Sequence, residues 1–336
     1  DLFIMNADDG ADTVDGGSGS EDTISYANLD STQGISVTLD GTTSKTVTIT
    51  NGTNDSIKNI ENVTGGAGND TIIGDGFNNI LIGNSGNDSI EGGAAKDTLY
   101  GGVGIDTLKG DDGEDTIFGG VDKDIINGGA GNDILYGGDK SLSEADVDTD
   151  ETGTGNDTIY GGAGNDSILG GSDAGLDTLY GEAGNDIIEG GSGVDTIDGG
   201  TGDDRIFGGI GTNTIVGGGN TSTTTGGGDW KDYSDLSSTN ITIDLAAGTA
   251  SDTNISDTIS LIEHIKMGDG DDYVQGDVYD NSLLGGDGSD TLDVSRASSS
   301  VTISLTNNNG TTTGGGIGTD TFESFESFVG SSNADS

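Results

Sequence analysis

Residues 65–88 read "GGAGNDTIIGDGFNNILIGNSGND", which is almost three copies of one nine-residue unit. In each copy, glycines lead into a turn that closes on Asn or Asp, and an aliphatic residue follows two places later. The middle copy differs, because Phe77 stands where the unit has Gly and Asn79 stands where it has Asp. So faithful a repeat predicts a regular structure, in which the aspartate at the sixth position has a defined task.

The composition limits what can hold such a chain together. Its 336 residues include 66 Gly, no Pro and no Cys, and only 5% are aromatic. Glycine loses the most backbone entropy on folding and adds no apolar surface, so burial of large side chains cannot be the main source of stability. The absence of Cys excludes disulfides and thiolate metal sites.

The charge is the second limit. Against 60 acidic residues stand 10 basic ones, which gives a formal net charge of −50. Such a charge opposes compaction unless counter-ions are bound, and it makes nucleic acid and anionic membranes poor partners. No apolar run reaches the roughly 18 residues of a membrane helix, and the first residues lack the basic start of a signal peptide. We therefore expect no membrane insertion.

The unit recurs with a period of nine residues over most of the chain. Position six is occupied by Asp70, Asn79, Asp88, Asp97, Asp106, Asp115, Asp124, Asp133, Asp157, Asp166, Asp177, Asp186, Asp195, Asp204 and Asn213. Two places after each stands Ile or Leu, namely Ile72, Leu81, Ile90, Leu99, Leu108, Ile117, Ile126, Leu135, Ile159, Ile168, Leu179, Ile188, Ile197, Ile206 and Ile215. A disordered linker would not keep an aliphatic residue in this one place.

Two interruptions shift the period. The step from Asp166 to Asp177 carries two extra residues, and the acidic stretch 139–152 separates Asp133 from Asp157. That break of 24 residues equals nine plus fifteen, which favours one continuous array with an insertion.

The glycine content excludes helix, because each Gly would cost about 1 kcal/mol there. A six-residue turn followed by a three-residue strand fits the unit, and two units then form one coil of 18 residues. Coils would stack as parallel strands about 4.8 Å apart, with the Ile or Leu side chains inside. The predicted fold class is all-β, a parallel β-roll (β-solenoid) with β-rich modules at its ends.

Stacking would align the aspartates in columns. Units of like parity lie above one another, so Asp88, Asp106 and Asp124 form one column, and Asp97, Asp115 and Asp133 form the other. Carboxylates about 5 Å apart repel each other by roughly 3 kcal/mol per pair at an effective dielectric constant of 20. A hard cation held by carboxylates and backbone carbonyls would remove this cost, and six or more oxygen ligands favour calcium over zinc or magnesium.

The unit "GGAGNDTII" resembles the repeats-in-toxin (RTX) nonapeptide Gly-Gly-x-Gly-x-Asp-x-(aliphatic)-x, whose known form is a calcium-binding parallel β-roll. The resemblance covers residues 65–217 and recurs near the end of the chain. It implies that one turn gives the carbonyls of positions two and four with its Asp, and that the turn one coil later gives the carbonyls of positions one and three with its own Asp.

Carried over residue by residue, the resemblance implies several Ca²⁺ sites. One would use Gly102, Gly104 and Asp106 with Gly119, Val121 and Asp124, and another Asp111, Gly113 and Asp115 with Gly128, Ala130 and Asp133. The further implied ligands are Gly66, Gly68, Asp70, Gly83, Ser85, Gly86, Asp88, Gly93, Asp97, Gly101, Val103, Gly110, Asp112, Asp157, Asp166, Gly175, Asp177, Gly184, Asp186, Gly190, Ser192, Asp195, Gly199, Thr201, Asp204, Asp272 and Asp290.

Some turns depart from the family pattern. Asn79 keeps an oxygen but loses the charge, so we expect little or no calcium there and expect its turn to end the roll. Asp122 replaces a Gly, and the extra residues before Asp157 and Asp177 interrupt the pattern at those turns.

A longer repeat occupies the flanks. Residues 55–70, 257–272 and 320–335 share one spacing of acidic and apolar residues, and "GISVTLD" (34–40), "NITIDLA" (240–246) and "SVTISLT" (300–306) precede them. Their alternation predicts half-buried strands. We expect β-rich modules at 1–64 and 219–267, the roll at 65–218, a short second roll at 268–294 and the start of a third module at 295–336. The third copy stops at Asp335, so we expect a piece of a longer protein.

Catalytic candidates are few. His264 is the only His and stands where the other copies have Asn62 and Ser327, which favours a packing or surface role. No His-Glu-x-x-His motif occurs, and the pair Asp271 and Asp272 is explained by the repeat better than by glycosidase chemistry. Trp230 is expected to pack on the strands that follow it or to close a roll end. The sequence therefore predicts no catalytic residues and no organic cofactor.

Function follows from the resemblance as an expectation. It implies a calcium-binding, secreted segment of a bacterial surface, S-layer or adhesin protein, which folds on calcium binding after type I secretion. Expected partners are calcium, the type I secretion machinery, and other copies of the chain or a cell-surface component. The alternatives are the non-catalytic tail of a secreted protease, lipase or alginate epimerase, and an ice- or glycan-binding module.

Overall fold

The nine-residue unit folds as a turn followed by a strand, and successive strands alternate between two parallel sheets. The computed structural model describes residues 1–336 apart from 7–9, 139–154, 220–227, 237–239 and 307–308. Within that part of the chain every regular element is a β-strand. The predicted fold class, an all-β parallel β-roll, is therefore confirmed.

The chain forms two compact units, Asp1–Tyr180 and Gly181–Ser336, and strand β18 (Thr178–Ala183) contains the boundary between them. In the first unit, sheet A consists in spatial order of β1 (Leu2–Ile4), β3 (Thr23–Ser25), β7 (Asn62–Thr64), β9 (Ile80–Ser85), β11 (Thr98–Val103), β13 (Thr116–Val121), β15 (Ile134–Tyr136) and β17 (Ser167–Gly175). Sheet B consists of β2 (Thr13–Asp15), β6 (Asp55–Lys58), β5 (Lys45–Ile49), β4 (Ile35–Thr38), β8 (Thr71–Ile73), β10 (Ser89–Ala94), β12 (Thr107–Asp112), β14 (Ile125–Ala130) and β16 (Thr158–Ala163).

The second unit repeats the plan. Its sheet C contains β19 (Ile187–Gly193), β21 (Arg205–Phe207), β22 (Ile210–Gly211), β24 (Trp230–Asp232), β28 (His264–Lys266), β30 (Ser282–Leu284), β34 (Thr319–Glu323), β33 (Asn309–Gly314) and β32 (Val301–Thr306). Its sheet D contains β20 (Thr196–Thr201), β23 (Thr214–Gly219), β27 (Ser256–Ser260), β26 (Thr249–Ser251), β25 (Thr242–Asp244), β29 (Tyr273–Gln275), β31 (Thr291–Asp293) and β35 (Ser327–Val329).

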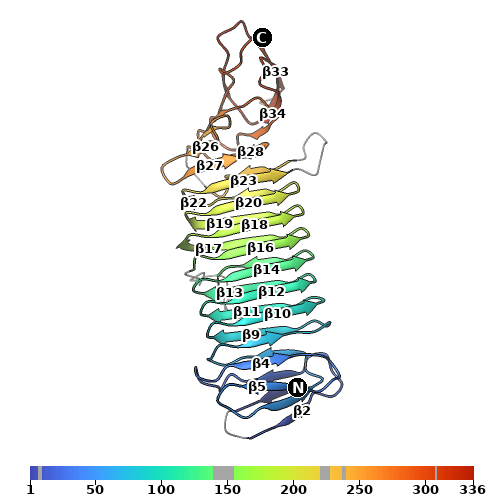
Figure 1. Cartoon of the computed structure of the whole chain (residues 1–336). Coiled ribbons are helices and arrows are strands. Elements are labelled where there is room, and N and C mark those ends of the chain that lie inside the picture. Colours follow the sequence, from blue (N-terminus) through green and yellow to red (C-terminus); the bar gives the residue numbers. More distant parts are fainter. Residues whose placement is uncertain (7–9, 139–154, 220–227, 237–239, 307–308) are drawn as a thin grey trace. The chain divides into compact units, whose positions relative to one another are not determined.

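The core is the predicted aliphatic column. The fifteen Ile and Leu residues that stand two places after the position-six residues, from Ile72 to Ile215, are no more than 1% exposed. Within the first unit these residues pack on one another in the parallel register of successive coils, as Leu99 does on Ile117 and Leu108 on Ile126. Figure 1 shows β9 to β14 as successive rungs of this stack. Because one such residue per unit fills the interior, the turns can consist of glycine and polar residues.

Most roll strands are longer than the three residues predicted. Strand β11 pairs with β13 at Thr98–Tyr100 and again at Gly102 and Val103. The ladder resumes beyond Gly101 because Gly102 adopts φ +111°, a conformation that glycine enters at little cost. The turn is therefore itself part of the parallel stack.

Three antiparallel meanders interrupt the parallel order. They are β4–β5–β6, β25–β26–β27 and β32–β33–β34, and their first strands are the three that the alternating sequences predict. The outer strands of the first meander pair in parallel with β8 and β2.

The expectation that the Asn79 turn ends the roll is wrong. Strand β9, which follows Asn79, pairs in parallel with β7, and β7 pairs with β3. Coils continue on both sides because Val63 and Ile24 extend the inward column past Leu81. The meander is thus inserted in a coil and does not close the stack.

The roll also continues across the acidic insertion. Strand β14 pairs in parallel with β16, and Ile126 lies against Ile159 in the same register as elsewhere. The Asp124 N–H donates to Asp157 Oδ1 at 2.7 Å, although 33 residues separate them. Residues 139–152 lie outside the described part of the chain, but the coils on either side of them stack directly.

Removal of residues 139–153 should leave the fold intact. The deletion joins Gly137-Gly138 to Thr154-Gly155-Asn156-Asp157 and so restores one complete nine-residue unit. We expect the same calcium-dependent circular dichroism and an unchanged melting temperature. Deletion of residues 116–130, equally long but taken from the stacked coils, should abolish the β signal. A loss of structure in the first variant would contradict the continuous stack.

Candidate metal centres

The aspartates at position six are tied into the two predicted columns by their own backbone. The N–H of Asp88 donates to Asp106 Oδ1 at 2.7 Å, and the N–H of Asp106 donates to Asp124 Oδ1 at 2.8 Å. In the other column, Asp97 and Asp115 donate in the same way to the aspartate one coil later, at 2.7 and 2.8 Å. Sequence reasoning treated the facing carboxylates as repelling groups and missed this bond, which holds Oδ1 in place.

The second carboxylate oxygen of these residues is buried and receives no hydrogen bond. Among the described residues this holds for Oδ2 of Asp22, Asp88, Asp97, Asp106, Asp115, Asp124, Asp133, Asp204, Asp229, Asp272 and Asp290. A buried carboxylate oxygen without a donor costs several kcal/mol unless a cation neutralises it. A whole row of such oxygens indicates positions at which a cation binds.

In most of these turns the free oxygen faces a recess that a side chain would fill. A Cβ added to Gly119, the first residue of its turn, would lie 2.6 Å from Asp124 Oδ2 and 2.5 Å from the Gly137 carbonyl oxygen. Gly83, Gly92, Gly101, Gly110 and Gly128 have the same surroundings, an Asp Oδ2 and a carbonyl from the next coil. Glycine is required at position one because two oxygens converge where Cβ would be.

The available ligands are all oxygens. Carboxylates come from consecutive coils, and backbone carbonyls come from turns in which Gly102 (φ +111°) and Gly104 (φ +128°) adopt conformations rare for other residues. Within the described residues, no group of three His, Cys, Asp or Glu side chains converges as a metal site would need. Carbonyls must therefore complete the ligand set, which suits Ca²⁺ and gives a soft metal nothing to bind.

Burial changes the protonation of the carboxylates. Desolvation raises the pKa of Asp88 to about 7 and that of Asp124 to about 9. The backbone hydrogen bond to Oδ1 opposes this rise, and neighbouring carboxylates such as Asp106 add to it. Protons and cations therefore compete for the same buried oxygens, and calcium binding should weaken as the pH falls.

The structure brings the predicted residues together as follows. Every predicted position-six aspartate is buried, including Asp70, Asp157, Asp166, Asp177, Asp186 and Asp195. The extra residues before Asp157 and Asp177 leave the column intact, since the backbone N–H of Asp157 donates to Asp177 Oδ1 at 2.9 Å. Val103 at position three is 50% exposed. Because its side chain has no ligand atom, only its backbone carbonyl could bind an ion.

Two aspartates with the same buried, donor-free oxygen, Asp22 and Asp229, were not predicted from the sequence. Asp22 closes "GSGSED" and has Ile24 two places later, so the pattern itself could have found it. Asp229 accepts the Asp204 N–H at 2.9 Å. Lys231 stands two places later, where the repeat has Ile or Leu, so the sequence pattern does not identify this unit.

Asn79 differs from the aspartates as its sequence suggests. Its Oδ1 accepts the Asp75 N–H at 2.9 Å, and its Nδ2 donates to the Glu61 carbonyl at 2.7 Å. Both polar atoms of the Asn79 amide therefore have partners within the chain, whereas Oδ2 of aspartates such as Asp88 and Asp97 has none among the described residues.

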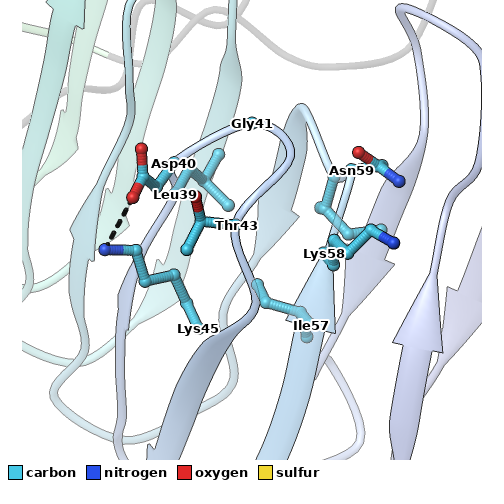
Figure 2. Close-up of a pocket in the computed structure, with 9 residues that line it drawn as sticks. Leu39, Asp40, Gly41, Thr43, Lys45, Ile57, Lys58 and Asn59 are labelled. Atoms are coloured by element: carbon cyan, nitrogen blue, oxygen red, sulfur yellow. Dashed lines mark ion pairs between the residues drawn. The ribbon is translucent and has the colours of Figure 1, made fainter.

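The remaining candidates have structural roles. His264 is 5% exposed, stacks on Trp230 with ring centroids 4.8 Å apart, and accepts the Ser282 N–H at Nδ1. Trp230 thus packs on the following strand, one of the two predicted positions. Figure 2 shows a shallow depression beside the β4–β5 turn, where Lys45 pairs with Asp40 at 2.8 Å and no nucleophile faces a base.

Comparison with known families agrees with the geometry. A family model described as RTX calcium-binding nonapeptide repeat matches residues 4–20, 60–76, 73–108, 109–139, 146–176, 172–197, 189–223 and 268–296, together more than half of the chain. A search of curated proteins found no match. None of the described residues forms a helix with the length and hydropathy of a membrane span.

Substitution of Asp106 by Asn should weaken calcium binding. Asp106 Oδ1 holds one coil and its Oδ2 faces the recess at Gly101, so the change removes a charge from the middle of a column. Loss of one charge-assisted interaction should raise the calcium midpoint for folding about tenfold. Asp112→Asn is the matched control, because the Asp112 side chain is exposed and its carbonyl is unchanged. Equal midpoints for the two variants would exclude Asp106 as a ligand.

Proposed function

Because the chain belongs to the RTX calcium-binding nonapeptide repeat family, whose repeats bind Ca²⁺, we propose that it folds when calcium binds after secretion and then serves as a rigid extracellular spacer. The observation that carries the proposal is the row of buried, donor-free Asp Oδ2 atoms in both columns. Without a bound cation these atoms oppose folding, and with one they hold consecutive coils together.

The assignment of ligands is part of the proposal. Each ion would be held by two position-six carboxylates from consecutive coils and by carbonyls of the two turns, as at Asp106 with Asp124 and at Asp115 with Asp133. The recesses at Gly101 and Gly110 support these two sites in particular, because each combines an Asp oxygen with a carbonyl of the coil that follows.

The net charge supports the proposed order of events, in which the chain is exported before it folds. A formal charge of −50 keeps the calcium-free chain extended, and metal binding is coupled to folding because the site does not exist in the unfolded chain. Cytosolic calcium is far below the 10⁻⁴–10⁻³ M range over which extracellular calcium modules respond. An unfolded chain inside the cell and a folded one outside suit export through a type I secretion machinery.

The division into modules remains a prediction. We propose a roll at residues 65–218, a shorter roll at 268–294 and meander-containing modules at 1–64, 219–267 and from 295 onward. The three meanders support this division, because each lies in one of the proposed modules.

A scaffold in a surface, S-layer or adhesin protein also needs a contact face, and one face of sheet A is suited to it. In the strands of sheet A from β7 to the described start of β17, the positions that flank the inward residue carry no charge, although Asn62 and Phe118 among them are buried. These positions are Asn62, Thr64, Ile80, Ile82, Thr98, Tyr100, Thr116, Phe118, Ile134, Tyr136, Ser167 and Leu169. Tyr100, Phe118 and Tyr136 stack with ring centroids 4.9 and 4.8 Å apart. In so acidic a chain, this face favours contact with an uncharged surface or a second copy.

The alternatives have less support. A role as the tail of a secreted protease, lipase or epimerase would be decided by the rest of the gene, and we propose that the present chain is itself not an enzyme. Ice or glycan binding would need a regular array of exposed donors or open ring faces, whereas the stacked rings of sheet A cover one another's faces.

A calcium titration followed by far-ultraviolet circular dichroism tests the proposed folding. We expect a cooperative gain of β signal at sub-millimolar to millimolar calcium, with several ions bound by calorimetry. Magnesium at the same concentration should have little effect, because it prefers octahedral sites that retain water. A β signal already complete in EGTA would refute coupled binding and folding.

A contact through sheet A predicts weak self-association in calcium. Thr98→Glu and Thr116→Glu place charges on the uncharged face, whereas Thr107→Glu places one at the same position of sheet B. Sedimentation velocity should show that only the first two variants lose the association. A wild-type chain that stays monomeric at high concentration would refute contact between copies.

A further inference from the structure

Three aspartates extend the columns but differ from the calcium-type positions. Asp55, Asp257 and Asp320 stand at the start of the third strand of each meander, and each is at most 3% exposed. Their Oδ1 atoms accept the backbone N–H of Asp12, Asn213 and Asn281 at 2.9, 3.1 and 3.1 Å. By this bond they occupy the same kind of position as Asp106 and Asp124 do in the roll.

Their second oxygens are satisfied by the chain itself. Asp55 Oδ2 accepts the Tyr26 hydroxyl at 3.2 Å, and Asp257 Oδ2 accepts the Tyr233 hydroxyl at 3.3 Å. Asp320 Oδ2 accepts the Thr312 hydroxyl at 2.8 Å. In the roll, Oδ2 of the aspartate faces a recess. In all three modules the equivalent Oδ2 accepts a hydrogen bond from a hydroxyl.

The three donors come from different places in the fold. Tyr26 directly follows β3, Tyr233 directly follows β24, and Thr312 lies within β33. Two different residue types on strands of different modules therefore deliver a hydroxyl to the same atom. Similarity between copies of the longer repeat does not explain this for Thr312, which comes from another strand of its module.

The second module adds a positive charge of its own. Lys231 occupies the inward position of β24, where Ile206 and Ile265 stand on the neighbouring strands, and it is 1% exposed. Its ammonium lies 3.7 Å from the centre of the Tyr233 ring and donates to the Asp232 carbonyl at 3.0 Å. Burial lowers the pKa of Lys231 to about 8, and the Asp257 carboxylate opposes this effect.

The asparagines of the columns donate to backbone carbonyls, although Asn281 Oδ1 is itself buried without a donor in the described part of the chain. Asn79 and Asn281 donate from Nδ2 to the Glu61 and Glu263 carbonyls at 2.7 and 3.3 Å, and Asn213 donates to the Gly208 carbonyl at 3.1 Å. Asn213 and Asn281 are the residues whose N–H groups bind Asp257 and Asp320. Hydroxyl donors thus stand at Asp55, Asp257 and Asp320 on the third strand of each meander, whereas Asp22 and Asp229, which precede the meanders in two of the modules, keep a buried Oδ2 without a donor from any described residue.

We propose that the third strands of the meanders, β6, β27 and β34, are built to do without calcium: the Tyr26, Tyr233 and Thr312 hydroxyls take the cation's place at Asp55, Asp257 and Asp320, and the Lys231 ammonium on the Tyr233 ring adds a positive charge in the second module. The inference rests on the proposed calcium-coupled folding, because it divides the columns into positions that need an ion and positions that do not. These strands then keep their structure in a calcium-free solution that unfolds the roll, and they present ready strand edges on which coils can form.

Hydrogen exchange of the full-length chain, read by mass spectrometry in EGTA and in calcium, tests the inference. In EGTA, peptides from 55–64 and 256–266 should stay protected relative to a chain in denaturant, whereas peptides from 98–136 should exchange freely. In calcium all of them should be protected. Module peptides that exchange in EGTA as fast as the roll peptides would overturn the inference. Roll peptides protected in EGTA would instead refute calcium-coupled folding.

Variants assign the effect to the hydroxyls. Tyr26→Phe should make exchange of the 55–64 peptides in EGTA about tenfold faster, as expected for the loss of one buried hydrogen bond, and leave 256–266 unchanged. Tyr233→Phe should do the reverse, and Lys231→Met should act on the same module as Tyr233→Phe. Tyr279→Phe is the matched control, because Tyr279 is 69% exposed. Equal exchange in Tyr26→Phe, Tyr233→Phe and the control would overturn the role of the hydroxyls.

Discussion

The fold depends on a carboxylate held in a place that water cannot reach. In each turn of the columns, Oδ1 accepts an N–H from the preceding coil, and this bond fixes Oδ2 against the recess at position one of the turn. The hydrogen bond alone does not offset the desolvation of the carboxylate, as the raised pKa of Asp124 indicates. A bound cation would complete the arrangement, and on the proposed mechanism the stability of the roll depends on its binding.

The glycines follow from this constraint. Position one must lack a Cβ because two oxygens converge there, and positions two and four turn carbonyls through backbone conformations such as those of Gly102 and Gly104. Position eight provides most of the apolar burial, and it is Ile or Leu throughout the roll. A chain with so few large apolar residues can fold because each coil needs only two of them, and because bound ions replace the rest of a conventional core.

Much of this architecture could be predicted from the sequence, because a strict period converts directly into geometry. The inward column from Ile72 to Ile215, the pairing of Asp88 with Asp106, and the continuity from Asp133 to Asp157 all follow from counting in nines. What could not be predicted depends on contacts between residues far apart in sequence. The bond from the Asp204 N–H to Asp229 and the meander order β6–β5–β4 are of this kind. The Asn79 turn was misjudged because its own sequence does not show that Val63 and Ile24 continue the column.

The contrast between Ile24 and Lys231 shows how one scaffold accommodates two sources of charge. Both residues point inward beside a tyrosine that bonds a column aspartate, Tyr26 with Asp55 and Tyr233 with Asp257. A lysine in a core otherwise made of Ile and Leu is destabilising unless other groups meet its ammonium, which here lies on the Tyr233 ring and donates to the Asp232 carbonyl. On the proposed mechanism the compensating cation of the coils comes from solution, so their stability follows the calcium concentration. Where the chain carries its own cation or hydroxyl, that dependence is removed, and the distribution of these groups along the columns determines which parts of the molecule respond to calcium.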